Sequence, residues 1–314
     1  MKNNFLKITR LLYVAILFTG LIACSPGKKV ADKATANERL TDALLWKIEG
    51  EGIEQPSYIF GTIHLISQDE FFYPSGVLAA VDESDRITFE IDINDMMDIS
   101  KQLGVMQKAF MKDNTSLKDL LSDDDYLLVK QHFDKMGIPL FFLERMQPMF
   151  LTVFGYGDMQ PGDLQSGEMV SYELKLNELA KQQDKETAGL ETIDYQLSAV
   201  DSIPYKEQAD MLVQTIKNSD EGKDELEAMM SMYKEQRIDD MYTEIGEEGG
   251  SSADFEKILL TNRNKNWIPI MEDMVREKPT LFAVGAGHLG GPNGMIRLLM
   301  AKGYELTPVS QTDK

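Results

Sequence analysis

The chain has 314 residues, of which 43% are hydrophobic and 27% are charged, and its formal net charge is −20 at pH 7. This composition is typical of a folded protein, because such a chain can bury enough apolar surface to offset the entropy lost on folding. The acidic charge argues against a nucleic-acid partner, since that kind of binding needs Lys and Arg to neutralise phosphates.

The first 23 residues are typical of an export signal. Three basic residues precede or flank the start of an apolar stretch at residues 11–18, and this stretch is too short to span a bilayer. Residues 21–25 read Leu-Ile-Ala-Cys-Ser and resemble the lipobox of bacterial lipoproteins. The alternative is an ordinary signal peptide that happens to contain Cys24.

The lipobox resemblance implies that Cys24 carries a diacylglycerol group and becomes the mature N-terminus. We therefore predict a signal peptide over residues 1–23, a flexible tether over 24–40 and one folded domain over 41–314. Removal of the signal would change the net charge to −23. The expected partner is a lipid bilayer, contacted through acylated Cys24. The expected location is the bacterial cell envelope, at the outer membrane or the periplasmic face of the membrane.

Six short apolar runs predict β-strands in the rest of the chain. The runs are Leu44–Ile48, Ser57–Gly61, Arg86–Ile91, Thr187–Leu190, Thr280–Val284 and Tyr304–Val309.

Long amphipathic stretches between these runs predict helices. The first helix is expected to begin after Ser122, where three acids favour the positive end of a helix, and to run to Met136 before Gly137 and Pro139. The other helices are predicted at Glu168–Gln183, Thr192–Asn218, Asp224–Ile245 and Ala253–Lys278. Pro269 is expected to bend or break the last of these helices.

The order of these elements predicts the fold class. Strands lie near both ends of the domain and helices dominate its middle. We therefore predict an α/β fold, in which N- and C-terminal strands form a mixed sheet and a large helical insertion covers one side.

The most specific pattern is a repeated strand-Gly-x-x-His motif. Residues 57–64 place His64 three positions after Gly61, and residues 280–288 place His288 three positions after Gly285. Glycine allows a sharp turn or a close approach by another group. Side chains that follow such strands lie at the carboxyl edge of a sheet, where α/β proteins bind ligands. If the two strands are neighbours, both imidazoles converge on one pocket.

The second copy also fits the G-x-G-x-x-G pattern of dinucleotide-binding proteins at residues 285–290. Pro292 delays the next helix, and too few residues follow to complete the usual binding unit. We therefore expect no nucleotide cofactor.

Acidic partners for the histidines must come from other strands. Glu90 lies at the apolar end of one strand and Glu191 at a strand-to-helix junction. A charge in such a place is costly unless it is paired or functional. Glu90 is therefore a candidate base, metal ligand or orienting group, and Glu191 is a candidate base. The alternative for each is a helix cap or an ion-pair partner. Arg263 could neutralise one of them, stabilise an oxyanion or form a surface ion pair.

Together these residues resemble the TraB/GumN family, which includes the Tiki metalloproteases. The resemblance covers about residues 44 to 309. Many members carry Gly-Leu-Asp where this chain has Val-Ser-Tyr-Glu at residues 170–173, so the role of that Asp is not carried over. The matching stretches are Phe60–Leu65, Ile87–Glu90, Gly189–Thr192 with Gln196, Asn262–Asn264 before Trp267, and Ala283–Leu289 with Gly294 and Gly303–Tyr304.

The resemblance implies an α/β fold related to erythromycin-esterase-like and haem-uptake ChaN-like proteins. It also implies a site built from His64, Glu90, Glu191, Arg263 and His288. In the Tiki branch it implies peptide hydrolysis that depends on a divalent metal.

Our preferred hypothesis is a membrane-anchored hydrolase, and specifically a peptidase, with a peptide or a small molecule as its substrate. In one version His64, Glu90 and His288 hold a divalent cation, with Mn²⁺ or Co²⁺ indicated by the Tiki resemblance, and Glu191 or Glu90 is the base. In the other version no metal takes part, and a histidine paired with a glutamate deprotonates water. The alternatives are a binding lipoprotein for haem or a peptide, and a regulatory lipoprotein whose former site is structural.

Overall fold

The computed structural model describes residues 38–98, 104, 107–152, 167–217, 219–248 and 256–309. The predicted signal peptide, Cys24 and most of the predicted tether lie outside these residues. Within the described part, no helix is both long and apolar enough to cross a membrane.

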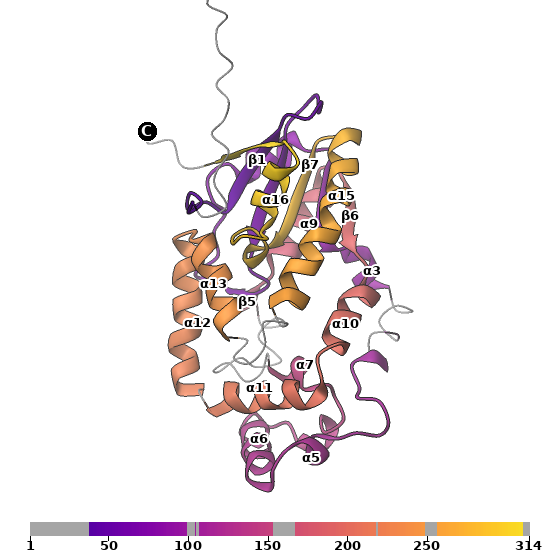
Figure 1. Cartoon of the computed structure of the whole chain (residues 1–314), viewed down its shortest axis with the longest axis vertical. Helices are drawn as coiled ribbons and strands as arrows, with labels where there is room; N and C mark the ends of the chain where they lie inside the picture. The colour runs from indigo at the N-terminus through magenta and orange to yellow at the C-terminus, as the bar shows by residue number, and fades with distance from the viewer. Residues whose placement is uncertain are drawn as a thin grey trace, which may run out of the picture. The chain divides into compact units, whose positions relative to one another are not determined.

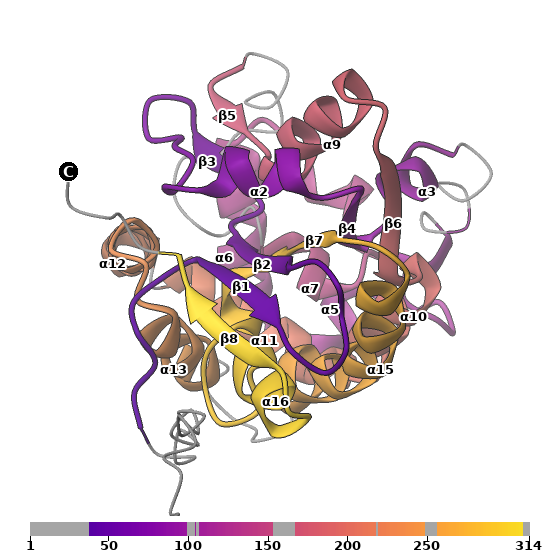
Figure 2. The ribbon, with the colours of Figure 1, turned by 90° about the horizontal axis from the view of Figure 1, so that it is seen from above.

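Six strands form one mixed sheet (Figure 1), and their order is β6-β4-β7-β2-β1-β8 (Figure 2). All six runs predicted from the sequence are strands of this sheet. Their bounds are β1 Leu45–Glu49, β2 Ser57–Thr62, β4 Arg86–Ile91, β6 Glu186–Glu191, β7 Thr280–Gly285 and β8 Glu305–Pro308. A separate antiparallel pair joins β3, Ile66–Ser67, to β5, Met169–Val170.

Four neighbouring strands, β6, β4, β7 and β2, run parallel, whereas β1 lies antiparallel between β2 and β8. Every residue of β2 and β4 is buried, as expected for strands of a parallel sheet that is covered on both faces. This burial explains why the sequence shows them as continuous apolar runs. The carboxyl ends of the four parallel strands lie at the same edge of the sheet.

Helices cover both faces of this sheet (Figure 2). Helices α2, Val77–Glu83, and α9, Tyr172–Gln182, lie on one face, while α15, Asn262–Glu277, and α16, Met295–Ala301, lie on the other. The prediction of a mixed α/β fold is confirmed, but the helices are not confined to one side. The reason is that parallel strands are buried on both faces and need cover on both.

The remaining helices lie between the strands in sequence. They are α3 Ile93–Met97, α5 Leu117–Leu120, α6 Asp123–Lys135, α7 Pro148–Thr152, α10 Ile193–Asp201, α11 Tyr205–Lys217, α12 Ser219–Lys234 and α13 Ile238–Glu248. Three shorter segments are η1 Leu140–Phe142, the π-helix η2 Lys257–Thr261 and η3 Ala286–His288. Helices α5, α6, α7 and α11 enclose a small apolar cluster of their own, which includes Val129, Phe133 and Leu212.

Several predicted helix bounds differ from the structure. Helix α6 ends as predicted and begins with Ser122, whose hydroxyl accepts a hydrogen bond from the Asp125 amide. The stretch predicted as one helix over Thr192–Asn218 is two helices, α10 and α11, which are separated before Pro204. Likewise α12 and α13 are separated at Gln236, which has a positive φ of 61°. Helix α15 continues through Pro269 without a break.

Candidate functional site

The two Gly-x-x-His motifs leave neighbouring strands at the same edge of the sheet. Strand β2 pairs with β7 in parallel, with Thr62 opposite Gly285. His64 follows β2, and His288 ends η3 directly after β7. Both histidines line one cavity of about 310 Å³. The predicted convergence of the two motifs is therefore confirmed.

The glycines of the two motifs are needed for close packing. Neither has a positive φ. A Cβ atom on Gly61 would lie 2.7 Å from Leu289 Cδ1 and 3.0 Å from the backbone of Ala286, and one on Gly285 would lie 3.2 Å from Glu90 Oε1. Any larger residue would force apart the ends of the strands or displace the Glu90 carboxylate.

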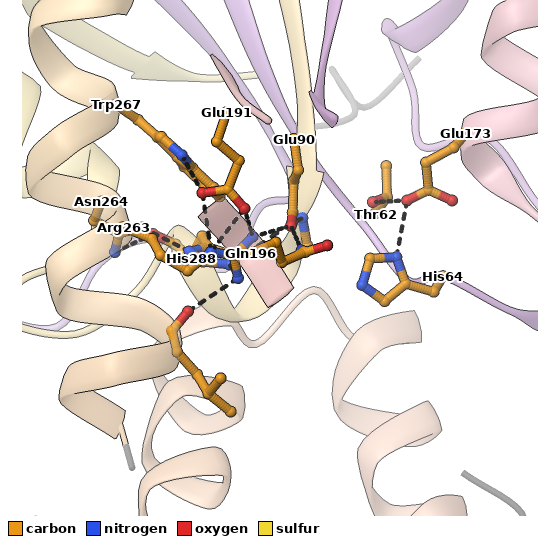
Figure 3. Close-up of polar contacts among 12 residues, drawn as sticks. Thr62, His64, Glu90, Glu173, Glu191, Gln196, Arg263, Asn264, Trp267 and His288 are labelled. Atoms are coloured by element: carbon orange, nitrogen blue, oxygen red, sulfur yellow. Dashed lines mark hydrogen bonds and ion pairs between the residues drawn. The ribbon is translucent and has the colours of Figure 1, made fainter. Parts of the chain in front are cut away.

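Arg263 lies at the centre of a buried charged network (Figure 3). Its Nη2 atom donates to Glu90 Oε2 at 2.5 Å and to Glu191 Oε1 at 2.7 Å, and its Nε atom donates to Glu191 at 3.1 Å. Its Nη1 atom donates to the Leu259 carbonyl at 3.0 Å and faces His288 Nε2 at 3.2 Å. Both terminal nitrogens and Nε are therefore engaged by protein acceptors.

Helix α15 presents Arg263 and Trp267 on the same buried face, because residues four apart in a helix are neighbours. The Trp267 indole donates to Glu191 Oε2 at 2.9 Å, and the Arg263 guanidinium lies 4.7 Å from the Trp267 ring centroid. Both oxygens of Glu191 thus accept hydrogen bonds. Burial raises the pKa of Glu191, and the hydrogen bonds and charge of Arg263 oppose that rise.

The hydrogen bonds around His288 determine which nitrogen carries its proton. The Asn264 Nδ2 atom lies 3.3 Å from the His288 carbonyl and 2.9 Å from the Asn293 carbonyl, so Asn264 Oδ1 faces His288 Nδ1 at 2.6 Å. Nδ1 is therefore the donor, and the Nε2 lone pair faces Arg263. His288 is 4% exposed. Burial lowers its pKa; Glu90 opposes this effect and Arg263 adds to it, so His288 is neutral near pH 7.

Glu90 remains ionised in the middle of this network. Burial would raise its pKa, but attraction to His288, Arg263 and His64 and a hydrogen bond from the Gly285 amide outweigh that effect and lower it. The amide donates to Glu90 Oε1 at 2.8 Å. Since His288 is neutral near pH 7, its attraction contributes little at that pH, and the permanent charge of Arg263 is the main cause of the lowered pKa of Glu90.

His64 is separate from the Arg263 network and pairs with Glu173 (Figure 3). Its Nδ1 atom lies 3.2 Å from Glu173 Oε1, which also accepts from Thr62 Oγ1 at 2.9 Å. The other Glu173 oxygen accepts from Ser171 Oγ at 2.8 Å. The hydrogen bond to Glu173 raises the pKa of His64, partial desolvation in the cavity opposes the rise, and the charge of Glu90 adds to it. Because 71% of the His64 side chain is exposed, solvent screening limits the shift.

Glu173 is a site residue that was not predicted from the sequence. The one signal for it was its position at residues 170–173, where the chain departs from the Gly-Leu-Asp of the family resemblance. Ser171 begins α9 by accepting a hydrogen bond from the Leu174 amide, and this cap directs Glu173, in the first turn, toward the end of β2. An acid from another part of the chain therefore completes the first Gly-x-x-His motif.

Two cavities meet at this site. One has a volume of about 380 Å³ and the other about 310 Å³, and His64, Glu90 and Gln196 line both. The apolar residues of the larger cavity are Leu65, Phe89, Ile91, Ile93, Met96 and Leu174. Those of the smaller cavity include Ile63, Met229, Met241, Ile245, Leu259 and Leu260.

The residues as placed do not fit the predicted metal site. Among the described residues, no group of three His, Cys, Asp or Glu side chains is positioned to hold a metal ion. The guanidinium of Arg263 lies against Glu90 and His288, where a shared cation would need to bind. His64, the third predicted ligand, bonds to Glu173 instead.

The predicted site residues thus fall into two groups. The structure brings Glu90, Glu191, Arg263 and His288 into one network, and places His64 beside it at the border of the two cavities. Catalytic roles for all five remain predictions.

Comparisons with known proteins agree with the resemblance seen in the sequence. A model of the TraB/PrgY/gumN family matches residues 44–308. Metalloprotease TIKI1 of Danio rerio is 21% identical over 91% of this chain and 67% of its own length. Metalloprotease TIKI2 of Danio rerio is 21% identical over 84% of this chain and 60% of its own length. Metalloprotease TIKI1 of Xenopus tropicalis is 22% identical over 89% of this chain and 64% of its own length.

The chain therefore spans about two thirds of the length of these relatives. No solved structure matches the chain. The predicted relationship to erythromycin-esterase-like and ChaN-like folds consequently stays a prediction.

Proposed function

This chain belongs to the TraB/PrgY/gumN family, and we propose that it is a hydrolase that cleaves peptide bonds beside His64, Glu90 and Glu173. The observation that carries the proposal is the exposed His64 imidazole, which Glu173 holds at the border of two cavities. The names of the relatives, which call them metalloproteases, support a peptide as the substrate.

The pairing of His64 with Glu173 suits general-base catalysis. When Nδ1–H donates to Glu173, the Nε2 atom keeps its lone pair and can take a proton from a water molecule. The oxygen of that water bonds to the peptide carbonyl carbon, and the carbon–nitrogen bond then breaks. His64 returns the proton to the departing amine, so that one water is consumed and His64 is neutral again.

Glu90 and Glu173 supply negative charge next to the developing imidazolium. Such fixed charge stabilises the protonated histidine in the transition state. Glu90 is available for this role because Arg263 and the Gly285 amide keep it ionised and fixed. Arg263 itself has its donors engaged by protein acceptors, so we assign it to positioning and not to an oxyanion. Glu191 is assigned to holding Arg263, since both of its oxygens are occupied.

A metal-dependent reaction is the second candidate, and the names of the relatives favour it. As placed, Glu90 and His288 are not free to bind a metal, because the Arg263 guanidinium contacts both. Chelation distinguishes the two candidates: a metal-independent hydrolase keeps its activity in excess chelator, whereas a metalloprotease loses it and recovers it with Mn²⁺ or Co²⁺.

The test of the hydrolase proposal uses the purified full chain and a peptide library, with products identified by mass spectrometry. We expect His64→Ala to reduce kcat by about 10²–10⁴-fold, the usual contribution of a general base. The matched control is His132→Ala, which changes the histidine in α6 and should retain activity. Specific peptide or haem binding without turnover would favour the binding-lipoprotein alternative.

We also propose that the protein is anchored in the bacterial cell envelope through a lipid on Cys24. The support is the lipobox-like sequence at residues 21–25. Labelling of producing cells with an alkyne fatty acid should tag the wild-type chain and leave Cys24→Ser unlabelled. A tag of equal strength in both chains would contradict the anchor.

A further inference from the structure

The two cavities of the site are built from different parts of the fold. Strand β4 with helices α3 and α9 provides most of the larger cavity. Helices α12 and α13 with η2 and η3 provide most of the smaller cavity. They share His64, Glu90 and Gln196, the polar side chains at their border. Each cavity thus extends away from this border over a separate set of apolar side chains.

An extended peptide has a geometry that matches this division. Successive side chains along an extended backbone point to opposite sides. If the cleaved bond lies at the border beside His64, the side chain before it enters one cavity and the side chain after it enters the other.

The charges at the border do not select for a charged substrate. Glu90 is paired with Arg263 at 2.5 Å, and Glu173 accepts hydrogen bonds from Thr62 and Ser171 as well as from His64. An incoming basic side chain would have to displace these partners. An acidic side chain would meet two carboxylates, while the cationic groups among the lining residues, Arg263 and protonated His64, are already paired with carboxylates.

The apolar linings of the two cavities favour apolar substrate side chains, because removing these side chains from water carries no desolvation penalty. Burial of apolar surface is favourable, whereas a buried polar group costs free energy unless it finds a partner. Ser171 and Glu173 also line the larger cavity, and Thr62, Arg263 and His288 the smaller, but these polar side chains are already hydrogen-bonded within the protein. The other side chains beyond the border, such as Leu174 and Met229, are apolar and offer no strong partner.

From these observations we propose that the substrate is a peptide with large apolar side chains on both sides of the cleaved bond, one for each cavity. This inference rests on the proposed hydrolase function and specifies its substrate class.

The first experiment measures kcat/KM of the full chain on short peptides with two varied central positions in an alanine background. We expect Leu, Met or Phe at both positions to be cleaved at least tenfold faster than peptides with Ser, Glu or Lys at either position. Cleavage at equal rates, or faster cleavage beside Lys, would overturn the proposal.

Substitutions in each cavity test whether the two positions are read separately. Leu174 is 47% exposed, so Leu174→Asp introduces a charge in the larger cavity without burying it. Met229→Glu introduces a charge in the smaller cavity, at a half-buried position. Each variant should lose its preference for apolar residues at only one of the two varied peptide positions, and kcat/KM for peptides with Lys at that position should rise. The affected position should be different in the two variants.

A matched control excludes a general effect of added charge. Leu127 is 51% exposed on α6 and lines neither cavity, so Leu127→Asp should leave both preferences unchanged. Circular dichroism of each variant shows whether it is folded. Loss of preference at both positions in either folded cavity variant would contradict the assignment of one side chain to each cavity.

Binding measurements separate a failure of this inference from a failure of the proposed function. Fluorescence anisotropy of the same peptides, labelled at one end, is measured on the His64→Ala variant. Apolar preference in binding, with no cleavage by the wild-type chain, would contradict the hydrolase and support the inferred peptide class. Cleavage by the wild type without apolar preference would support the hydrolase and contradict the inferred peptide class.

Discussion

The Nδ1 atom of His64 lies 3.2 Å from Oε1 of Glu173, a residue 109 positions later in the chain. This pair sets one of the two motif histidines apart from the other. His288, at the equivalent place after β7, bonds to Asn264 and Arg263 and is buried. The two copies of one motif therefore have different chemistry, and only His64 has an exposed imidazole paired with a carboxylate.

Replacement of Glu173 by Gln should change the pH dependence of catalysis. Glu173 raises the pKa of His64, and a general base acts only when it is deprotonated, so wild-type kcat/KM rises with pH through that raised value. Removal of the charge lowers the pKa, and the acidic limb of the profile should move to lower pH. We also expect kcat to fall by about 10²-fold. An acidic limb at the same pH would show that Glu173 does not act on the base.

Removal of Arg263 should destabilise the fold strongly. Arg263→Ala leaves Glu90 and Glu191 buried without their cation, and loss of one partner of a buried ion pair costs about 3–5 kcal/mol. Urea unfolding measures the loss. The matched control is Arg276→Ala, because Arg276 forms exposed ion pairs on the same helix, for which about 1 kcal/mol or less is expected. Similar losses in the two variants would argue against a central role for the Arg263 network.

Metal binding should depend on whether Arg263 is present. In the wild-type chain, isothermal titration with Mn²⁺ should show no saturable binding at Glu90 and His288, because the Arg263 guanidinium contacts both side chains. In Arg263→Ala the freed carboxylates and imidazole can bind a cation, so Mn²⁺ should raise the Tm of this variant. Tight Mn²⁺ binding by the wild type that His288→Ala abolishes would contradict this arrangement.

His288 should make the protein less stable as the pH falls below about 6.5, its ordinary pKa. Its folded pKa is lowered, so below 6.5 the unfolded chain binds a proton that the native chain does not. Stability from this residue is therefore present above that pH and decreases toward the lowered value, by at most about 1.4 kcal/mol per pH unit.

Urea unfolding at a series of pH values checks this expectation. The slope of stability against pH below 6.5 should be smaller in His288→Gln than in the wild type. His132→Gln, in α6, is the control and should keep the wild-type slope. Parallel curves for wild type and His288→Gln would mean that His288 does not couple folding to protons in this range.

The local features that the sequence predicted well are those governed by short-range chemistry. All six strands of the sheet were predicted. For β2, β4 and β7 the reason is that parallel strands covered on both faces read as continuous apolar runs. The start of α6 at Ser122 was predicted from its capping chemistry. The divisions at Pro204 and Gln236 were missed, since amphipathic patterns continue across such short breaks.

The sequence by itself also determined which residues gather at the site edge. Both Gly-x-x-His motifs, Glu90 and Glu191 follow or end predicted strands, and parallel strands bring their carboxyl ends to one edge. Family membership could likewise be recognised from these motifs.

Only the tertiary structure decided what each side chain does there. Arg263 reaches Glu90 and Glu191 because α15 packs over one face of the sheet, and this contact occupies the place that the sequence assigned to a metal. Glu173 reaches His64 because α9 packs on the other face. Burial and hydrogen-bond partners depend on which distant helices cover each strand end, and motif spacing carries no information about that packing.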